Sequence, residues 1–153
     1  MGSISFKSVG TTQKQSSLVS SPTPFGIKTP LQLSTTDGLL VMSYTLAEQV
    51  KDNLRNLLLT NWGERLGLYN FGANLRPLAT EFTTLDNFEN AAIQRIHDAV
   101  SRWMPYVELD RLESVVDHMN NKNTAVIRTT VVYDVPKLGI KSEKVEVTIY
   151  AVG

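Results

Sequence analysis

The regular pattern of apolar and polar residues begins near Leu39 and changes its period at Pro105. Between these points, apolar residues recur every three or four positions, which is the period of an amphipathic helix. One stripe consists of Tyr44, Ala47, Val50, Leu54, Leu57 and Leu58, and a second of Leu85, Phe88, Ala92, Ile96, Ala99, Val100 and Trp103. The pattern therefore predicts two amphipathic helices.

Local signals predict where these helices begin and end. Thr45 and Glu48 have the spacing of a capping box, in which the two side chains satisfy free backbone N–H groups at a helix start. Asn61 and Gly63 tolerate the left-handed conformation that is common at helix C-termini, so we expect them to end the first helix. Pro105 disfavours helical geometry at the preceding residue and is expected to end the second helix.

After Pro105 the period is two, which predicts β-strands. Residues 106–116 form the first expected strand, and its irregular alternation between Leu109 and Leu112 indicates a β-bulge. Residues 125–135 and 144–152 form two more, with turns at 120–123 and 136–139. In the last strand the residues expected to face the core are Val145, Val147, Ile149 and Ala151. The predicted fold class is α+β, an antiparallel β-meander of about three strands covered by two amphipathic helices.

Residues 1–38 differ in composition from the rest of the chain. Ser, Thr, Gly and Pro fill 21 of these 38 positions, and the segment has a net charge of +2 against −2 for residues 39–153. So few apolar side chains cannot offset the entropy of folding. We therefore predict an extended polar N-terminal arm at 1–38 and an α+β domain at 39–153. Two interpretations of this segment stay open, a flexible leader and an arm that becomes ordered when it binds a partner. Phe6 and Phe25 favour the second.

Composition excludes several classes of function. The 153 residues include 15 basic and 15 acidic side chains, and this zero net charge argues against a general nucleic-acid binder. The absence of cysteine excludes disulfides, thiolate zinc sites and cysteine nucleophiles. No apolar run approaches the length of a membrane span. The chain is expected to be soluble, to be made in a cytoplasm and to need no cofactor.

Candidate catalytic residues are few. Glycoside hydrolysis needs two carboxyl groups across a cleft, one with a raised pKa, and Glu64 and Glu81 are the one pair that we nominate. Both are explained more simply as structural or surface carboxylates. No nucleophile elbow, phosphate-binding glycine loop or helical zinc motif occurs. His97 lies beside the apolar stripe of the second helix and is expected to be partly exposed.

The densest pattern lies in residues 57–78, which include the end of the first helix and the segment that follows it. Three glycines are interleaved there with three aromatic residues, namely Gly63, Gly67 and Gly72 with Trp62, Tyr69 and Phe71. Glycines allow tight turns and close backbone contacts, while aromatic side chains fix a segment to a core. We therefore expect a rigid connector that forms a recognised surface.

This segment resembles the small baseplate wedge proteins of contractile phage tails, often labelled lysozyme-like, and their relatives in type VI secretion baseplates. The family pattern is a helix ending in Leu-x-Thr-x-x-Gly-Glu-Arg, followed by Phe-Gly and a Leu. It is matched here by Leu58, Thr60, Gly63, Glu64, Arg65, Phe71, Gly72 and Leu75. The resemblance covers roughly residues 25–150. Where the family has Trp-Glu-Pro-Arg, this chain keeps Trp103 and Pro105 but replaces the acid and the base with Met104 and Tyr106.

The resemblance implies a structural subunit of a baseplate wedge that joins wedge partners and provides a platform for the first sheath ring. It implies other wedge proteins, tail sheath subunits and tail tube neighbours as partners, without nucleic acid or membrane. It also implies a place in the tail baseplate of a virion, assembled in the host bacterial cytoplasm, and no enzymatic activity. Two alternatives stay open: a peptidoglycan-degrading lysozyme-like hydrolase, and a small peptide- or RNA-binding α+β module.

Three further expectations concern individual segments. Arg65 is expected to pair with a carboxylate, in this chain or in a wedge partner. Residues 1–24 are expected to become ordered only in the assembly. The last strand is expected to pair on one side with strand 125–135 and to leave its other edge for a partner, because its charged residues (Lys141, Glu143, Lys144, Glu146) precede an uncharged stretch at 148–152.

Overall fold

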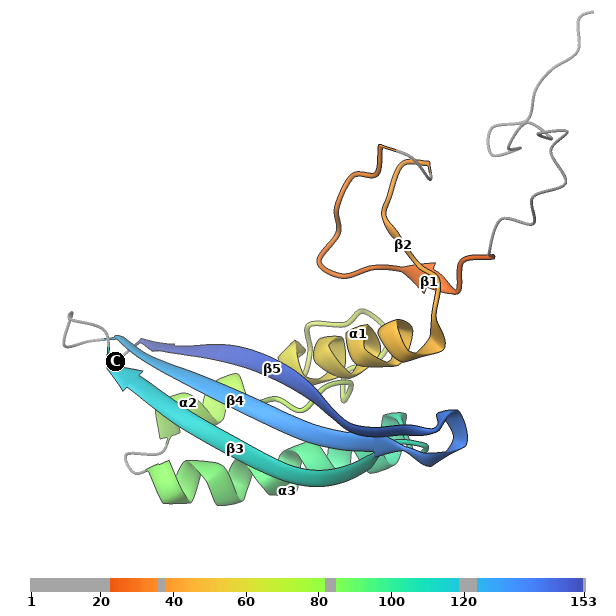
Figure 1. Cartoon of the computed structure of the whole chain (residues 1–153). Coiled ribbons are helices and arrows are strands. Elements are labelled where there is room, and N and C mark those ends of the chain that lie inside the picture. The colour runs from red at the N-terminus through yellow and green to blue at the C-terminus, as the bar shows by residue number, and fades with distance from the viewer. Residues whose placement is uncertain (1–22, 36–37, 82–84, 119–123, 153) are drawn as a thin grey trace, which may run out of the picture.

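A computed structural model describes residues 23–35, 38–81, 85–118 and 124–152 of the chain. Two short strands are followed by three helices and three long strands (Figure 1). In chain order these are β1 (Gly26–Ile27), β2 (Met42–Ser43), α1 (Leu46–Leu59), α2 (Arg76–Glu81), α3 (Leu85–Trp103), β3 (Glu108–His118), β4 (Thr124–Val135) and β5 (Ile140–Val152). The fold class is α+β, as predicted.

The three long strands form one antiparallel sheet in the order β3-β4-β5, which confirms the predicted meander. The register shifts between Leu109 and Arg111, which confirms the predicted bulge. β5 begins at Ile140, four residues earlier than expected, after a short 3-10 helix at Pro136–Leu138. The predicted turn at 120–123 lies outside the described residues.

All three helices cover the same face of the sheet. α1 and α2 pack against β5, whereas α3 packs against β3. The core between these layers takes alternate residues of the strands, namely Ile127, Val131, Tyr133, Val135, Val145, Val147 and Ile149. Burial raises the pKa of Tyr133 to about 12, and the nearby charge of Glu143 acts in the same direction. The side chain of Ala151 lies outside the described part of the chain.

The helix boundaries follow most of the predicted signals. Thr45 is the N-cap of α1, and its hydroxyl accepts a hydrogen bond from the backbone N–H of Glu48 at 3.2 Å. α3 ends at Trp103, two residues before Pro105. The expectation that a left-handed Asn61 ends α1 is wrong, because the helix already ends at Leu59 and Thr60 is extended. Gly63 is left-handed, with φ of 84°, but it lies in the turn that follows.

The N-terminal strands form a separate two-stranded ribbon beside the start of α1, away from the sheet (Figure 1). Gly26 pairs with Ser43 and Ile27 with Met42, so the ribbon joins residues on both sides of position 38. The backbone N–H of Thr29 donates to Asp52 of α1 at 2.9 Å. The division of the chain at residue 38 stays a prediction, and residues 1–22, including Phe6, lie outside the described part.

Candidate functional site

The connector between α1 and α2, residues 60–75, folds back onto the end of α1. The backbone N–H of Ala73 donates to the carbonyl of Leu57 at 3.0 Å, and that of Asn74 to the carbonyl of Thr60 at 3.3 Å. Within the connector, the N–H of Gly63 donates to the carbonyl of Tyr69 at 2.8 Å. These bonds give the connector a fixed shape without regular secondary structure, because they satisfy backbone groups that its turns leave free.

Gly72 is required where the connector meets α1. Its φ is 108°, a conformation that side chains rarely adopt, and a Cβ atom there would collide with the carbonyl of Thr60. Gly67 also has a positive φ, of 80°, but a Cβ atom at that position would meet nothing. The two glycines therefore tolerate substitution differently, although the sequence alone does not distinguish them.

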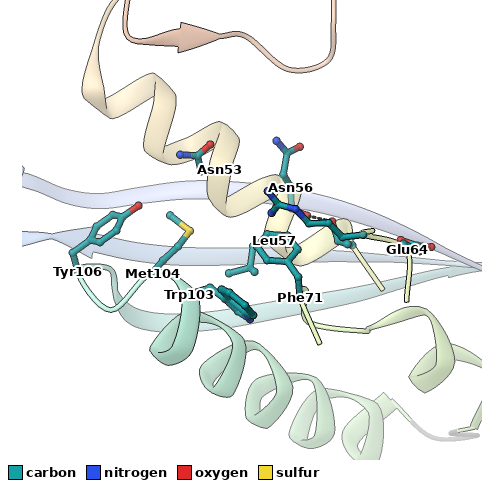
Figure 2. A pocket seen from close by; sticks show the side chains of 10 residues that line it. Asn53, Asn56, Leu57, Glu64, Phe71, Trp103, Met104 and Tyr106 are labelled. Atoms are coloured by element: carbon teal, nitrogen blue, oxygen red, sulfur yellow. Dashed lines mark hydrogen bonds between the residues drawn. The ribbon is translucent and has the colours of Figure 1, made fainter. Parts of the chain in front are cut away.

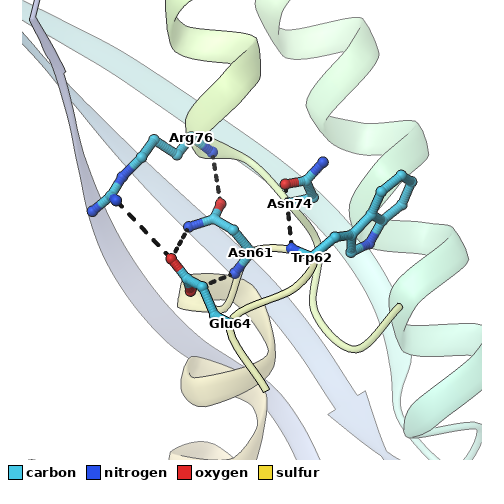
Figure 3. A network of polar contacts seen from close by, with 5 residues as sticks. All are labelled: Asn61, Trp62, Glu64, Asn74 and Arg76. Carbon is cyan, nitrogen blue, oxygen red and sulfur yellow. Dashed lines mark hydrogen bonds and ion pairs between the residues drawn. The ribbon is translucent and has the colours of Figure 1, made fainter. Parts of the chain in front are cut away.

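Glu64 closes the first turn of the connector (Figure 3). Its carboxylate accepts from the backbone N–H of Asn61 at 2.8 Å and from the Asn61 side-chain amide at 2.9 Å. The side-chain oxygen of Asn61 in turn accepts from the backbone N–H of Arg76 at 3.2 Å, and the Arg76 guanidinium lies 4.0 Å from Glu64. The two hydrogen bonds from Asn61, followed by the charge of Arg76, hold the pKa of Glu64 below its usual value.

A second set of contacts joins the connector to α3. The backbone N–H of Trp62 donates to the side-chain oxygen of Asn74 at 3.4 Å (Figure 3), and the Trp62 indole donates to the carbonyl of Gly72 at 3.1 Å. Arg95 of α3 donates to the carbonyl of Asn74 at 2.7 Å. Asn74 is itself left-handed, with φ of 52°. The connector is thus fixed to both long helices.

Arg65 contacts an aromatic ring. Its guanidinium carbon lies 4.3 Å from the centre of the Phe71 ring. Phe71 packs edge-on against Trp103 of α3, with ring centres 5.3 Å apart, and the guanidinium of Arg102 lies 5.2 Å from the Trp103 ring. The expected pairing of Arg65 with a carboxylate of this chain is absent among the described residues. Arg65 is also exposed, so the cost of an unpaired buried charge does not apply to it.

A groove of about 630 Å³ lies between α1, the connector and the end of α3 (Figure 2). Its apolar side is formed by Leu57, Phe71, Trp103 and Met104, and its polar side by Asn53, Asn56, Thr60, Glu64 and Arg65. Tyr106, in the turn before β3, also lines it. The groove therefore offers amides, a guanidinium and aromatic rings around an apolar floor. This combination suits binding of a protein segment.

Nine residues of the family motif are predicted to contact partners, namely Thr60, Gly63, Glu64, Arg65, Phe71, Gly72, Leu75, Trp103 and Pro105. The structure brings five of them together, since Thr60, Glu64, Arg65, Phe71 and Trp103 all line this groove. Gly63 and Gly72 shape the connector, and Leu75 is buried in the core. Pro105 is exposed beside Met104. The predicted role of these nine residues in partner contact stays a prediction.

Sequence reasoning missed several residues that build the site. Asn61, Asn74 and Arg76 form its hydrogen bonds, and Arg95 and Arg102 border a neighbouring cavity of about 300 Å³ beside Trp62 and Trp103. For Arg95 and Arg102 a sequence signal was available, because residues seven apart lie on one face of a helix. The contacts of Asn61 and Asn74 depend on side-chain directions that no local pattern specifies.

The chain matches the family model described as baseplate wedge protein gp25 over residues 44–137, which is more than half of its length. The chain belongs to this family. The match includes α1, the connector, α3 and most of the sheet, so the groove lies entirely within the part of the wedge protein that defines the family. Membership gives the chain a structural role in a tail baseplate.

Two solved structures share the fold of this wedge protein. One is a chain of the anti-feeding prophage baseplate determined by cryo-electron microscopy, with a TM-score of 0.57 and 19% identity over 71% of this chain and 82% of that chain. The other is the crystal structure of a "putative tail lysozyme" from Geobacter sulfurreducens, with a TM-score of 0.50 and 16% identity over 71% of this chain and 91% of that chain. No curated protein matches the sequence.

Proposed function

We propose that this wedge protein joins neighbouring wedge subunits and provides the platform on which the first ring of tail sheath assembles. The observation that favours this role is the outer edge of β5. In the sheet order β3-β4-β5, this strand has a neighbour on one side only among the described residues. An edge strand with free backbone groups can accept a strand from a partner, and pockets beside it can select the partner's side chains.

The unprotected part of this edge is short and well defined. Charged residues, which normally oppose strand pairing, end at Glu146, and Thr148, Ile149 and Tyr150 follow without any. Tyr150, two residues before the end of β5, is 61% exposed. A small cavity joins these three residues to Leu75 and Arg76 at the end of the connector. We propose that an extended segment of a sheath subunit or wedge neighbour pairs with this part of β5. Such pairing uses backbone hydrogen bonds and therefore does not depend on particular β5 side chains.

The test places a charge on each edge of the sheet in turn. Thr148 of β5 and Val115 of β3 both pair with Arg128 of β4, so Thr148→Glu and Val115→Glu add the same carboxylate beside the same arginine. Opposite charges across strands stabilise by about 0.2–1 kcal/mol, so both variants are expected to keep the wild-type Tm within a few degrees. Thr148→Glu is expected to reduce incorporation into baseplates at least about ten-fold, whereas Val115→Glu incorporates normally. Equal incorporation of the two variants would contradict the proposal.

The proposed role is structural and requires no catalysis. A hydrolase would need a general acid with a raised pKa, and the hydrogen bonds from Asn61 lower the pKa of Glu64 instead. The side chain of Glu81, the other nominated carboxylate, lies outside the described part of the chain. A zymogram on peptidoglycan that compares wild type with Glu64→Gln checks this point, and clearing that disappears in the variant would establish the hydrolase alternative.

A further inference from the structure

Arg65 at the groove and Arg102 at the neighbouring cavity point to a second interaction surface, distinct from the β5 edge. Arg65, Phe71, Trp103 and Arg102 form a continuous row, in which each guanidinium lies against one ring of an aromatic pair. We name this set the arginine–aromatic row. Phe71 and Trp103 are partly buried, whereas both arginines are exposed, so the row has a fixed centre and two accessible charged ends.

Neither arginine is neutralised within the part of the chain that the structure describes. No carboxylate there lies within 4.0 Å of Arg65 or Arg102. The acidic residues that border the two cavities have other neighbours: Glu64 bonds to Asn61, and Asp98 lies 3.9 Å from His97. The row is therefore locally positive in a chain whose net charge is zero.

Stacking prepares these guanidiniums for an ion pair. A ring holds the flat guanidinium in one plane, so less side-chain freedom is lost when a carboxylate binds through two parallel hydrogen bonds. The groove beside Arg65 also has an apolar floor of Leu57 and Met104, with Tyr106 at its rim (Figure 2). Arg, Trp and Tyr are the residues that most often dominate binding energy at protein interfaces.

We propose that the arginine–aromatic row binds an acidic segment of a neighbouring baseplate protein. Carboxylates of that segment pair with Arg65 and Arg102, and an apolar side chain between them enters the groove. Because successive distances along the row are 4.3, 5.3 and 5.2 Å, the two guanidinium carbons lie no more than about 15 Å apart, which roughly five residues of an extended chain span. The inference deepens the proposed wedge role by naming the chemistry of one partner.

A protein segment fits this surface better than a nucleic acid. Arg65 and Arg102 already cover one face of Phe71 and of Trp103, which leaves less aromatic surface for stacking of bases. The carboxylates of Glu64 and Asp98 border the same cavities and would repel a continuous phosphate backbone. An acidic segment that places one carboxylate at each arginine can avoid close approach to Glu64 and Asp98.

The test uses the full chain and two fluorescein-labelled nine-residue peptides, one of Glu-Leu-Ser repeats and one of Gln-Leu-Ser repeats. Fluorescence anisotropy at 50 mM and 200 mM NaCl gives each Kd. The Glu peptide is expected to bind at least about ten-fold tighter than the Gln peptide, and its binding should weaken at the higher salt concentration. Arg65→Gln combined with Arg102→Gln should reduce its binding to the level of the Gln peptide.

Matched variants separate the row from general charge. Arg55→Gln removes an exposed arginine of α1 that borders neither cavity, and it should change the Kd less than about two-fold. Arg65→Lys keeps the charge but lacks the planar fork, so we expect an intermediate loss of about three- to five-fold. Thermal melting checks that each variant folds, and all three are expected within a few degrees of wild type because the side chains are exposed.

Four results would overturn the inference: no binding of the Glu peptide at millimolar concentration, equal binding of both peptides, an equal loss in Arg55→Gln, or equally effective competition by ten-residue oligothymidine. Because the peptides are tested on the isolated chain, none of these results bears on the β5 edge. Conversely, normal incorporation of Thr148→Glu would contradict the proposal for the β5 edge but not the inference about the arginine–aromatic row.

Discussion

The two edges of the sheet are protected differently. β3 has a bulge at Leu109–Arg111, and Glu108, Asp110, Arg111 and Glu113 place charges along its first half. β5 has charges only up to Glu146, and its second half continues with Thr148, Ile149 and Tyr150. Bulges and charges are the usual means by which proteins prevent unwanted pairing at an edge. Both edges use these means, since the β4–β5 register also shifts, between Tyr133 and Val135. The difference lies in the second halves of the strands, because β3 has a further charge at Asp117 whereas β5 has none after Glu146.

The difference suggests that the fold reserves one edge for assembly. The uncharged half of β5 lies next to the connector, since Thr148, Ile149 and Tyr150 share a cavity with Leu75 and Arg76. The connector in turn belongs to the most specific part of the wedge family pattern. Local protection of an edge, rather than the overall charge of the chain, therefore indicates where a partner strand can pair.

The largest expected effect tests the assumption that the central strand is held on both sides. Thr130 of β4 pairs with Glu113 of β3 and with Glu146 of β5. Thr130→Pro must remove a ladder hydrogen bond, whichever way the N–H points, and should lower the free energy of unfolding by roughly 2–4 kcal/mol. Urea denaturation measures this value. Thr130→Ser keeps the N–H and is the control. An equally large loss of unfolding free energy in Thr130→Ser would show that the Thr130 side chain, and not the ladder hydrogen bond, causes the effect.

An effect of similar size tests whether the connector supports β5 from the helix side. Gly72→Ala introduces a Cβ atom against the carbonyl of Thr60 at a φ of 108°, and the expected loss is about 3 kcal/mol. Gly67→Ala has only the cost of a positive φ, about 1 kcal/mol, because a Cβ there meets nothing. Thermal melting of the two variants gives the comparison. If Gly67→Ala destabilises as much as Gly72→Ala, close contact with α1 is not what fixes the connector.

The smallest effect concerns Glu64, which bonds Asn61 and lies near Arg76 on the helix side of β5. Its pKa is lowered by folding, so its stabilising contribution is present above the ordinary Glu pKa and is lost as the pH falls through the lowered value. Glu64 is exposed, and screening by water should keep this contribution within about 0.5 kcal/mol. Glu64→Gln should therefore be slightly less stable than wild type at pH 7, and this difference should shrink as the pH falls below the ordinary Glu pKa. A constant difference across this range would contradict the assignment.

The sequence predicted the elements whose signals are local and repeated. The stripe from Phe88 to Trp103 and the stop at Pro105 located α3, and the break in alternation near Leu109 located the bulge. The short helix α2 was missed because six residues contain too little of a helical period to recognise. The ribbon of β1 and β2 was missed for the same reason, since each strand has two residues.

The candidate site was predictable only in part. Its glycines and aromatic residues were visible in the sequence, because tight turns and rigid packing need those residue types. The position of Arg65 over Phe71 instead of beside a carboxylate was not visible, since an exposed arginine can reach either and the choice depends on the folded neighbours. The contact of Arg95 with the Asn74 carbonyl likewise joins segments 21 residues apart.

The most direct test of the account is a cryo-electron microscopy reconstruction of the assembled baseplate that contains this wedge protein. We predict an extended strand of a sheath subunit or wedge neighbour, hydrogen-bonded to the backbone of β5 alongside Thr148, Ile149 and Tyr150, with no added strand on the β3 edge. A β5 edge that is open to solvent in the finished baseplate, or a partner strand on β3 instead, would contradict the account.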